Sequence, residues 1–178
     1  EQTKHESDLE STGLKALEQL KSAGDIKAFG MGINQKDSLA ILAQRLPLDF
    51  ALVAMPYTLL DQESLHDGMQ KCLMNSTSVI IGAPFASGIL ATGSGNNSKY
   101  GYANASEELQ LKVRQIEAVC KEHEVRLKAA ALQFVLAHPA VVSTIPGAIN
   151  VDQVTENIDC LESKIPEIFW KELKTKDL

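Results

Sequence analysis

Four segments of the sequence carry residue types that could bind a phosphorylated ligand, and each of them lies at the end of an apolar run. The first, residues 30–35 (GMGINQ), contains the first two glycines of a G-x-G-x-x-G phosphate loop, but Gln35 replaces the third glycine. The acidic residue that a Rossmann fold places at the end of the next strand is also missing, because Met55 and Pro56 lie there. The segment is therefore either part of a nucleotide site or a tight turn between a strand and a helix.

The second and third segments favour ligand binding over nucleophilic catalysis. Tyr57 follows the apolar run 50–55 and could either stack on a flat ligand or lie in the core. Residues 82–88 (GAPFASG) are small enough for backbone N–H groups to approach a pyrophosphate closely. They do not match the G-x-S-x-G motif, and the histidines that a serine nucleophile would need lie away from the strand ends. We therefore do not expect a serine hydrolase.

The fourth segment, residues 145–148 (IPGA), precedes a predicted helix that carries Gln153, Glu156 and Asn157. Glu156 and Asn157 fall one turn inside that helix, where they could hydrogen-bond an adenine or a ribose. A solvated helix face is the alternative interpretation of the same residues.

Hydrophobic periodicity places these segments at the ends of strands in an α/β fold. Helices are predicted over 8–23, from 34–37 to Pro47, and over 62–74, 109–123, 127–138 and 152–161, with a short one after Pro166; strands are predicted over 26–32, 50–55, 78–83 and 141–145. Asn34 or Asp37 is expected to cap the second helix. The run 50–55 is apolar throughout, which is typical of a strand buried on both faces. No hairpin dipeptide joins these strands, so we expect a parallel sheet with helical crossovers, whose ligands bind at the carboxyl ends of the strands.

The composition excludes several classes of protein. The chain has 178 residues, with 17 Lys and Arg against 23 Asp and Glu, and its net charge of −6 disfavours nucleic-acid binding. The longest apolar run, residues 78–86, is far shorter than the ~20 residues that cross a bilayer, and no secretory signal is visible. Three widely spaced cysteines indicate buried thiols in a reducing, cytoplasmic compartment. Cys120 and His123 share a helix face without a third ligand nearby, so no metal site is expected.

Taken together, these motifs resemble the aldo-keto reductases, and among them the NAD(P)-dependent aldose 1-dehydrogenases of the L-fucose (galactose) dehydrogenase type. The matching blocks, in chain order, are residues 13–34, 55–62, 78–93, 129–148 and 152–157. The resemblance implies a TIM barrel that binds a nicotinamide dinucleotide without a Rossmann fold. It places the predicted strands at positions five to eight of that barrel. About four strand–helix units, against the eight strands and ~250 residues of a typical barrel, suggest that residues 1–178 form a partial domain without the N-terminal half.

The resemblance also implies which residues bind the cofactor. Gly32 and Asn34 would lie near the nicotinamide, Ala83, Phe85, Ser87 and Gly88 would line the pyrophosphate loop, and Gly147, Ala148, Asn150, Gln153, Glu156 and Asn157 would surround the adenosine. Many members of the family carry cations that grip a 2′-phosphate at positions that are Gly147, Asn150 and Gln153 here. A lost charge-assisted hydrogen bond costs about 1.5–3 kcal/mol, so we expect NAD to be favoured over NADP.

The catalytic Asp, Tyr, Lys and His of the family come from the first half of the barrel, so no catalytic residue is expected in this chain. Neither His5 nor Tyr57, Tyr100 or Tyr102 lies in the catalytic context. The intact protein would move a hydride between nicotinamide and C1 of an aldose, such as L-fucose or D-arabinose, or another small carbonyl or hemiacetal. The isolated chain would be inactive without the missing half.

Two alternatives remain open from the sequence. One is a non-catalytic cofactor-binding or regulatory module built from half a barrel, which would need a partner to cover its open strand edges. The other is a different four-stranded α/β domain with unrelated chemistry.

Overall fold

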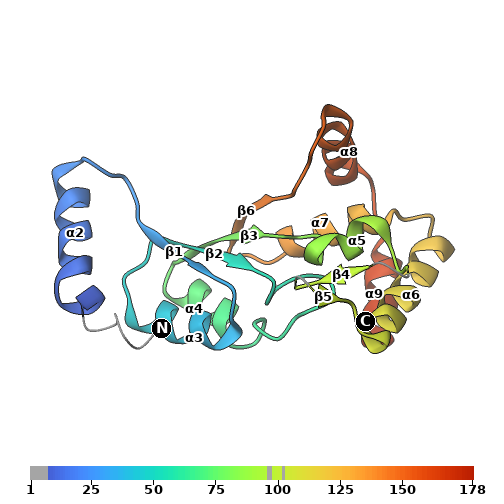
Figure 1. Cartoon of the computed structure of the whole chain (residues 1–178), viewed down its shortest axis with the longest axis horizontal. Helices are drawn as coiled ribbons and strands as arrows, with labels where there is room; N and C mark the ends of the chain where they lie inside the picture. The colour runs from blue at the N-terminus through green and yellow to red at the C-terminus, as the bar shows by residue number, and fades with distance from the viewer. Residues whose placement is uncertain (1–7, 96–97, 102) are drawn as a thin grey trace.

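The protein contains a parallel sheet of four strands, one face of which packs against helices (Figure 1). The structure, a computed structural model, describes residues 8–95, 98–101 and 103–178; His5 and Tyr102 therefore lie outside the described residues. The strands are β1 (Gly30–Ile33), β2 (Phe50–Ala54), β3 (Ser78–Gly82) and β6 (Val141–Ile145), and they lie in the order β1-β2-β3-β6. This order follows the chain without the reversal of a doubly wound sheet, as in a (β/α)₈ barrel.

The helix-facing side of the sheet forms one hydrophobic core. Ala51 pairs with Val79 and Val53 pairs with Ile81, and all four side chains are fully buried. They pack against apolar residues of the helices α3 (Lys36–Arg45), α4 (Gly68–Met74) and α7 (Leu127–Leu136). The alternate residues Leu52 and Ile80 point to the other face and are only half-buried. The expectation that 50–55 is buried on both faces is therefore wrong within this chain, because helices cover one face only.

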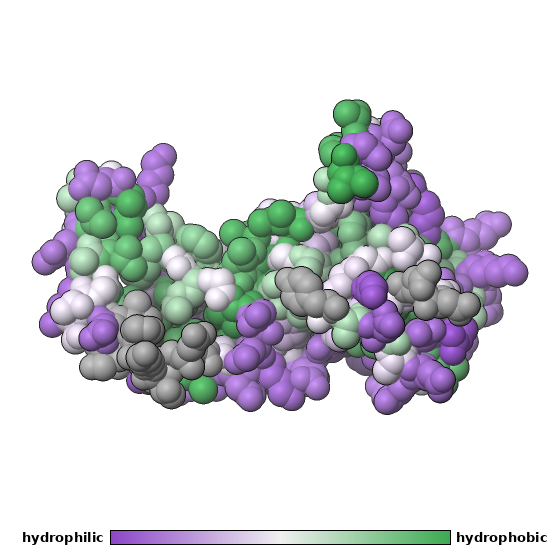
Figure 2. All heavy atoms as spheres, in the orientation of Figure 1, coloured by the Kyte–Doolittle hydropathy of each residue, from purple (hydrophilic) through white to green (hydrophobic). Residues whose placement is uncertain are grey.

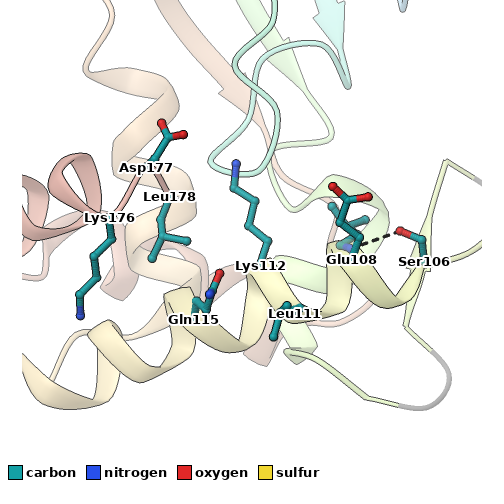
Figure 3. Close-up of a pocket in the computed structure, with 9 residues that line it drawn as sticks. Ser106, Glu108, Leu111, Lys112, Gln115, Lys176, Asp177 and Leu178 are labelled. Atoms are coloured by element: carbon teal, nitrogen blue, oxygen red, sulfur yellow. Dashed lines mark hydrogen bonds between the residues drawn. The ribbon is translucent and has the colours of Figure 1, made fainter.

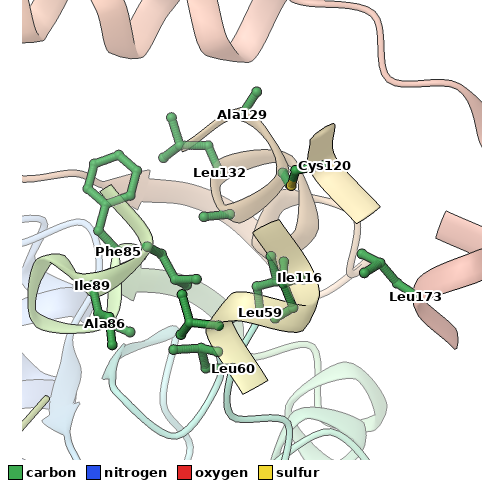
Figure 4. Close-up of a cluster of buried hydrophobic side chains, with 14 of the residues drawn as sticks. Leu59, Leu60, Phe85, Ala86, Ile89, Ile116, Cys120, Ala129, Leu132 and Leu173 are labelled. Carbon is green, nitrogen blue, oxygen red and sulfur yellow. The ribbon is translucent and has the colours of Figure 1, made fainter. Parts of the chain in front are cut away.

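A second core lies under the segment that follows β3 (Figure 4). Here α7 packs with α6 (Glu107–Glu122) and α9 (Glu167–Thr175) around Ile116, Leu132 and Phe169. The alanines of α7 at 129–131 are fully buried, which lets neighbouring elements approach closely. Ser106 caps α6, since its Oγ accepts a hydrogen bond from the backbone N–H of Leu109 at 3.2 Å.

Two helices stand away from the sheet at opposite ends (Figure 1). Near the N-terminus, a π-helical turn (Leu9–Gly13) leads into α2 (Leu14–Ala23), and Gly24 ends it in the left-handed conformation at φ 84°. At the other end α8 (Val151–Glu162) follows β6 and contacts α7. In the described part of the chain no helix is both long and apolar enough to span a bilayer.

Three local predictions differ from the structure. The helix predicted over 62–74 begins only at Gly68, because the residues before it form turns: the Ser64 N–H donates to the Pro56 carbonyl at 3.3 Å and the Leu65 N–H to the Gln62 carbonyl at 3.0 Å. Asn34 does not cap α3, which begins after Gln35 without a side-chain cap. The polar, glycine-rich composition of residues 84–105 predicts a long loop, but the described part of this stretch contains a 3₁₀ turn (Ala86–Gly88), α5 (Ile89–Thr92) and the antiparallel pair β4 (Lys99–Tyr100) and β5 (Ala103–Asn104).

Candidate functional site

The carboxyl ends of the four parallel strands meet at one edge of the sheet. Val53 pairs with Ile33 on one side and with Ile81 on the other, and Gly82 pairs with Ile145. The segments that follow these residues are the four that the sequence singles out. The strand order therefore places the 83–88 loop between the end of β2 and the loop that follows β6.

The loop after β3 has a backbone suited to binding an anion. Ala83, Ala86, Ser87 and Gly88 all have positive φ angles, of 55°, 48°, 61° and 100°. Phe85, in contrast, has a φ of −89°, and three left-handed residues follow it directly. A right-handed residue followed by a left-handed one turns successive N–H groups toward one side, as in an anion-binding nest. Within this loop the Ala86 and Gly88 N–H groups already donate to the carbonyls of Ala83 and Phe85, both at 2.9 Å. Each left-handed non-glycine residue costs of order 1–3 kcal/mol, and strain of this kind gathers at ligand sites.

The Ser87 side chain holds neighbouring segments together. Its Oγ accepts a hydrogen bond of 2.9 Å from the Gly101 N–H and lies 3.8 Å from the Met55 sulfur at the end of β2. A hollow of about 440 Å³ opens beside it and is lined by Ser87, Gly88, Thr92, Gly93, Gly95, Ser98 and Lys99. The Lys99 ammonium donates to Asn104 Oδ1 at 2.6 Å and supplies a cation at this hollow.

The start of α8 is closed by reciprocal hydrogen bonds. Asn150 Oδ1 accepts from the Gln153 N–H at 2.9 Å, while Gln153 Oε1 accepts from the Ile149 N–H at 2.9 Å, as in a capping box. Gly147 and Ala148 are exposed in the approach to the helix. Two of the residues predicted to surround an adenosine therefore shape the helix terminus with their side chains.

Asn157 is the polar residue of α8 that the protein leaves unsatisfied. Its side chain is 5% exposed, and its Oδ1 has no hydrogen-bond partner among the described residues. A buried acceptor without a partner costs roughly 1–3 kcal/mol. Glu156 lies next to it, and its carboxylate is 2.5 Å from the Lys128 ammonium. The side-chain Oδ1 of Asn157 thus retains the capacity to accept a hydrogen bond that the described residues do not supply.

The rings of Phe85 and Tyr57 are both buried. The ring of Phe85 is 7% exposed and belongs to the second core, so Phe85 can contribute its backbone rather than its ring to a phosphate site (Figure 4). Tyr57 is 3% exposed and packs at 5.5 Å from Phe134 and 5.7 Å from His138, measured between ring centroids. Burial raises the Tyr57 pKa to about 12. Of the two interpretations for Tyr57, the structure shows the core residue.

Gly32 and Asn34 are exposed at the end of β1, where a ligand could reach them. The sequence reasoning missed the two cations of this region, Lys99 and Lys128. Lys99 lies in the glycine-rich stretch 84–105. Lys128 is the sole charged residue of α7, a helix that is alanine-rich and apolar except for Gln133, and this signal could have identified it.

Other polar clusters lie away from the strand ends. A hollow of about 420 Å³ between α6 and the residues after α9 is lined by Lys112, Lys176 and Asp177, among others (Figure 3). Glu172 accepts hydrogen bonds from Lys176 and from His123 Nε2, and both bonds hold the pKa of its carboxyl below the usual value. Neither cluster contains a residue that the sequence assigned to the cofactor.

Comparisons with known proteins agree with the fold. Residues 4–177 match the Aldo/keto reductase family. Pyridoxal 4-dehydrogenase of Microbacterium luteolum is 36% identical over 166 residues, which are 93% of this chain and 48% of that protein. D-threo-aldose 1-dehydrogenase of a Pseudomonas species is 33% identical over 172 residues, or 96% of this chain and 52% of that protein.

Among solved structures, the apo form of aldo-keto reductase AKR11C1 from Bacillus halodurans has a TM-score of 0.73 at 22% identity, covering 91% of this chain and 55% of that one. This chain thus spans about half the length of the relatives that it matches. Since the family match extends over nearly the whole sequence, the chain belongs to the aldo/keto reductase family.

Proposed function

We propose that the complete protein is an NAD(P)-dependent oxidoreductase, to which these residues contribute the dinucleotide-binding half. The observation that carries the proposal is the buried, unpartnered Oδ1 of Asn157 on α8. Strand β3 lies next to β6, the strand before α8, and leads into the strained loop 83–88, which suits a phosphate. A nicotinamide dinucleotide has an adenine amine that suits Asn157 Oδ1 and a pyrophosphate that suits the 83–88 loop. When bound, it carries the hydride of the reaction.

Each segment at the sheet edge has a part in this binding. The N–H groups of Phe85 and Ser87 in the 83–88 loop hold the pyrophosphate, and the Ser87 side chain fixes that loop against Gly101. Glu156 and Asn157 receive the adenosine. The exposed Gly147 and Ala148 leave room beside it, and Gly32 and Asn34 at the end of β1 lie toward the nicotinamide.

The four strands correspond to the fifth to eighth of a (β/α)₈ barrel, and a further barrel half completes the protein. β1 and β6 are the outer strands of the sheet, and each has one neighbour among the described residues. Apolar surface gathers on α2, on α8 and on the sheet between them (Figure 2). Its exposed residues include Leu20, Val142, Ile145, Val151 and Ile158. The missing half covers this surface and supplies the catalytic Asp, Tyr, Lys and His, so the isolated chain is inactive.

The substrate is a small carbonyl or hemiacetal, with aldoses such as L-fucose and D-arabinose as the first candidates. The names of the two relatives at 33–36% identity point to an aldose and to pyridoxal. Both are aldehydes that close into cyclic hemiacetals with a free hydroxyl on the reacting carbon. In the oxidising direction a bound nicotinamide would supply the acceptor for the hydride of that carbon; loss of the hydroxyl proton to a base would then leave a lactone.

NAD is favoured over NADP as the cofactor. Gly147 carries no cation, and the neutral side chains of Asn150 and Gln153 are engaged in closing the start of α8. A 2′-phosphate would meet no free cation from these three residues.

The protein works in the cytoplasm. This location is supported by three cysteines that are buried and free of disulfides.

A turnover assay on the complete protein tests the proposal. Reduction of NAD⁺ and of NADP⁺ is followed by absorbance with L-fucose, D-arabinose and pyridoxal, and without substrate as the blank. We expect sugar-dependent reduction with NAD⁺ as the better cofactor. If neither dinucleotide binds or is reduced, the oxidoreductase assignment is wrong; reduction with NADP⁺ as the better cofactor contradicts the cofactor preference alone.

A further inference from the structure

Lys128 occupies an electrostatically unfavourable position that calls for an explanation. It lies in the first turn of α7, where the partial positive charge of a helix N-terminus disfavours a cation, and that turn contains no acidic residue. Its side chain is only 13% exposed. A cation withdrawn from water in this way is costly unless it is paired.

The partners of Lys128 come from two different strand ends. Its ammonium lies 2.5 Å from the Glu156 carboxylate on α8 and 5.5 Å from the centre of the Phe85 ring in the loop after β3. A cation near an aromatic face is attracted to it, more strongly when water is excluded. Lys128 therefore bridges the loop assigned to the pyrophosphate and the helix assigned to the adenosine.

The attachment of α8 shows what this bridge contributes. Gln133 donates to the carbonyl oxygens of Cys160 and Ser163, both at 2.8 Å, and Arg126 donates to the carbonyl of Asp159 at 2.8 Å. These bonds hold the later part of α8. The bond from Lys128 acts further toward the start of the helix, at the residue next to Asn157, and Figure 1 shows that α8 stands clear of the sheet there.

We propose that Lys128 is a positioning residue for the adenosine end of the dinucleotide, an inference that rests on the proposed function. Its ammonium orients the Glu156 carboxylate and neutralises it, so that the carboxylate can face a bound adenine without repelling the nearby phosphates. The same contact keeps α8 at a fixed distance from the 83–88 loop. Lys128 does not itself touch the reacting atoms.

The test is a set of binding titrations on the complete protein, with AMP, NMN and NAD⁺ as separate ligands. Lys128→Met is expected to raise the Kd of AMP and of NAD⁺ by about tenfold, as for one charge-assisted contact, and to leave the Kd of NMN unchanged. A purely structural role would weaken all three ligands together. Lys128→Arg keeps the charge and is expected to restore AMP binding to within about threefold. Lys15→Met, an exposed lysine on α2, is the control and leaves every Kd unchanged.

The double variant Lys128→Met/Glu156→Gln is expected to bind AMP no more weakly than the weaker single variant, because both substitutions remove one shared contact. If Lys128→Met does not fold, Glu156→Asp moves the carboxylate away from the ammonium without changing charge, and it is expected to weaken AMP but not NMN. Unchanged AMP binding in these variants would overturn the role of Lys128 and leave the proposed function standing. A wild-type protein that binds neither NAD⁺ nor NADP⁺ would overturn both.

Discussion

Replacing Asn157 by leucine should make the protein more stable and its cofactor site weaker. The two side chains have similar volume, and the substitution removes a buried carbonyl oxygen that has no partner among the described residues. The unmet acceptor costs roughly 1–3 kcal/mol; part of this gain is lost because the new side chain must pack in a site shaped for an amide. We therefore expect the free energy of unfolding without ligand to rise by about 1 kcal/mol.

The same substitution removes the group that we propose accepts a hydrogen bond from the adenine. A neutral hydrogen bond contributes about 0.5–1.5 kcal/mol, so the Kd for NAD⁺ should rise by roughly threefold to tenfold. Urea denaturation of the free protein measures the first effect, and calorimetric titration with NAD⁺ measures the second.

Asn75→Leu provides the matched control. The Asn75 amide nitrogen donates to the Ala43 carbonyl at 2.7 Å, so its replacement removes a bond that is made in the free protein. It should lower the free energy of unfolding by about 1 kcal/mol and leave NAD⁺ binding unchanged. If Asn157→Leu also destabilises the free protein and binds NAD⁺ normally, the assignment of Asn157 to the adenosine is refuted.

Three further changes test other parts of the account. Gly88→Ala places a side chain at φ 100° and should cost of order 1–3 kcal/mol in urea denaturation and weaken NAD⁺ binding; a neutral effect would contradict the role of the strained loop. Gln153→Arg should improve the Kd for NADP⁺ by about tenfold relative to NAD⁺, unless the 2′-phosphate lies elsewhere. Burial raises the pKa of Cys72 and Cys120 from 9.0 to about 11 and that of Tyr57 from 10.0 to about 12, so these groups ionise first in the unfolded chain. Stability should therefore fall as the pH rises from about 9 to 12, and Tyr57→Phe should lessen the fall above pH 10; a flat profile would contradict their burial.

The strands and the sheet edge were predictable because they depend on local pattern. The apolar runs that became β2 (Phe50–Ala54) and β3 (Ser78–Gly82) contain valine and isoleucine and end at small residues or proline. The spacing between strands then requires crossovers, which bring the strand ends together. The start of α6 likewise depends on a local contact, because the Ser106 side chain caps this helix.

The parts that depend on contacts distant in sequence were not predictable. Leu65, Met69 and Cys72 have helical spacing, yet the residues before Gly68 form turns. The Ser64 N–H, for example, donates to the carbonyl of Pro56, eight residues back. The burial of Phe85 depends on helices far along the chain. The partner of Lys128 lies 28 residues away, so the sequence could mark this lysine as unusual but could not connect it to Glu156.

The central claim is that the strand-end loops of this chain bind a nicotinamide dinucleotide, and hydrogen exchange of the complete protein with and without NAD⁺ tests it most directly. The account predicts slower exchange on binding in residues 83–88 and 150–157, with residues 106–115 around the separate hollow on α6 unaffected. Protection confined to the α6 hollow, or none in the two loops at saturating NAD⁺, would contradict the claim.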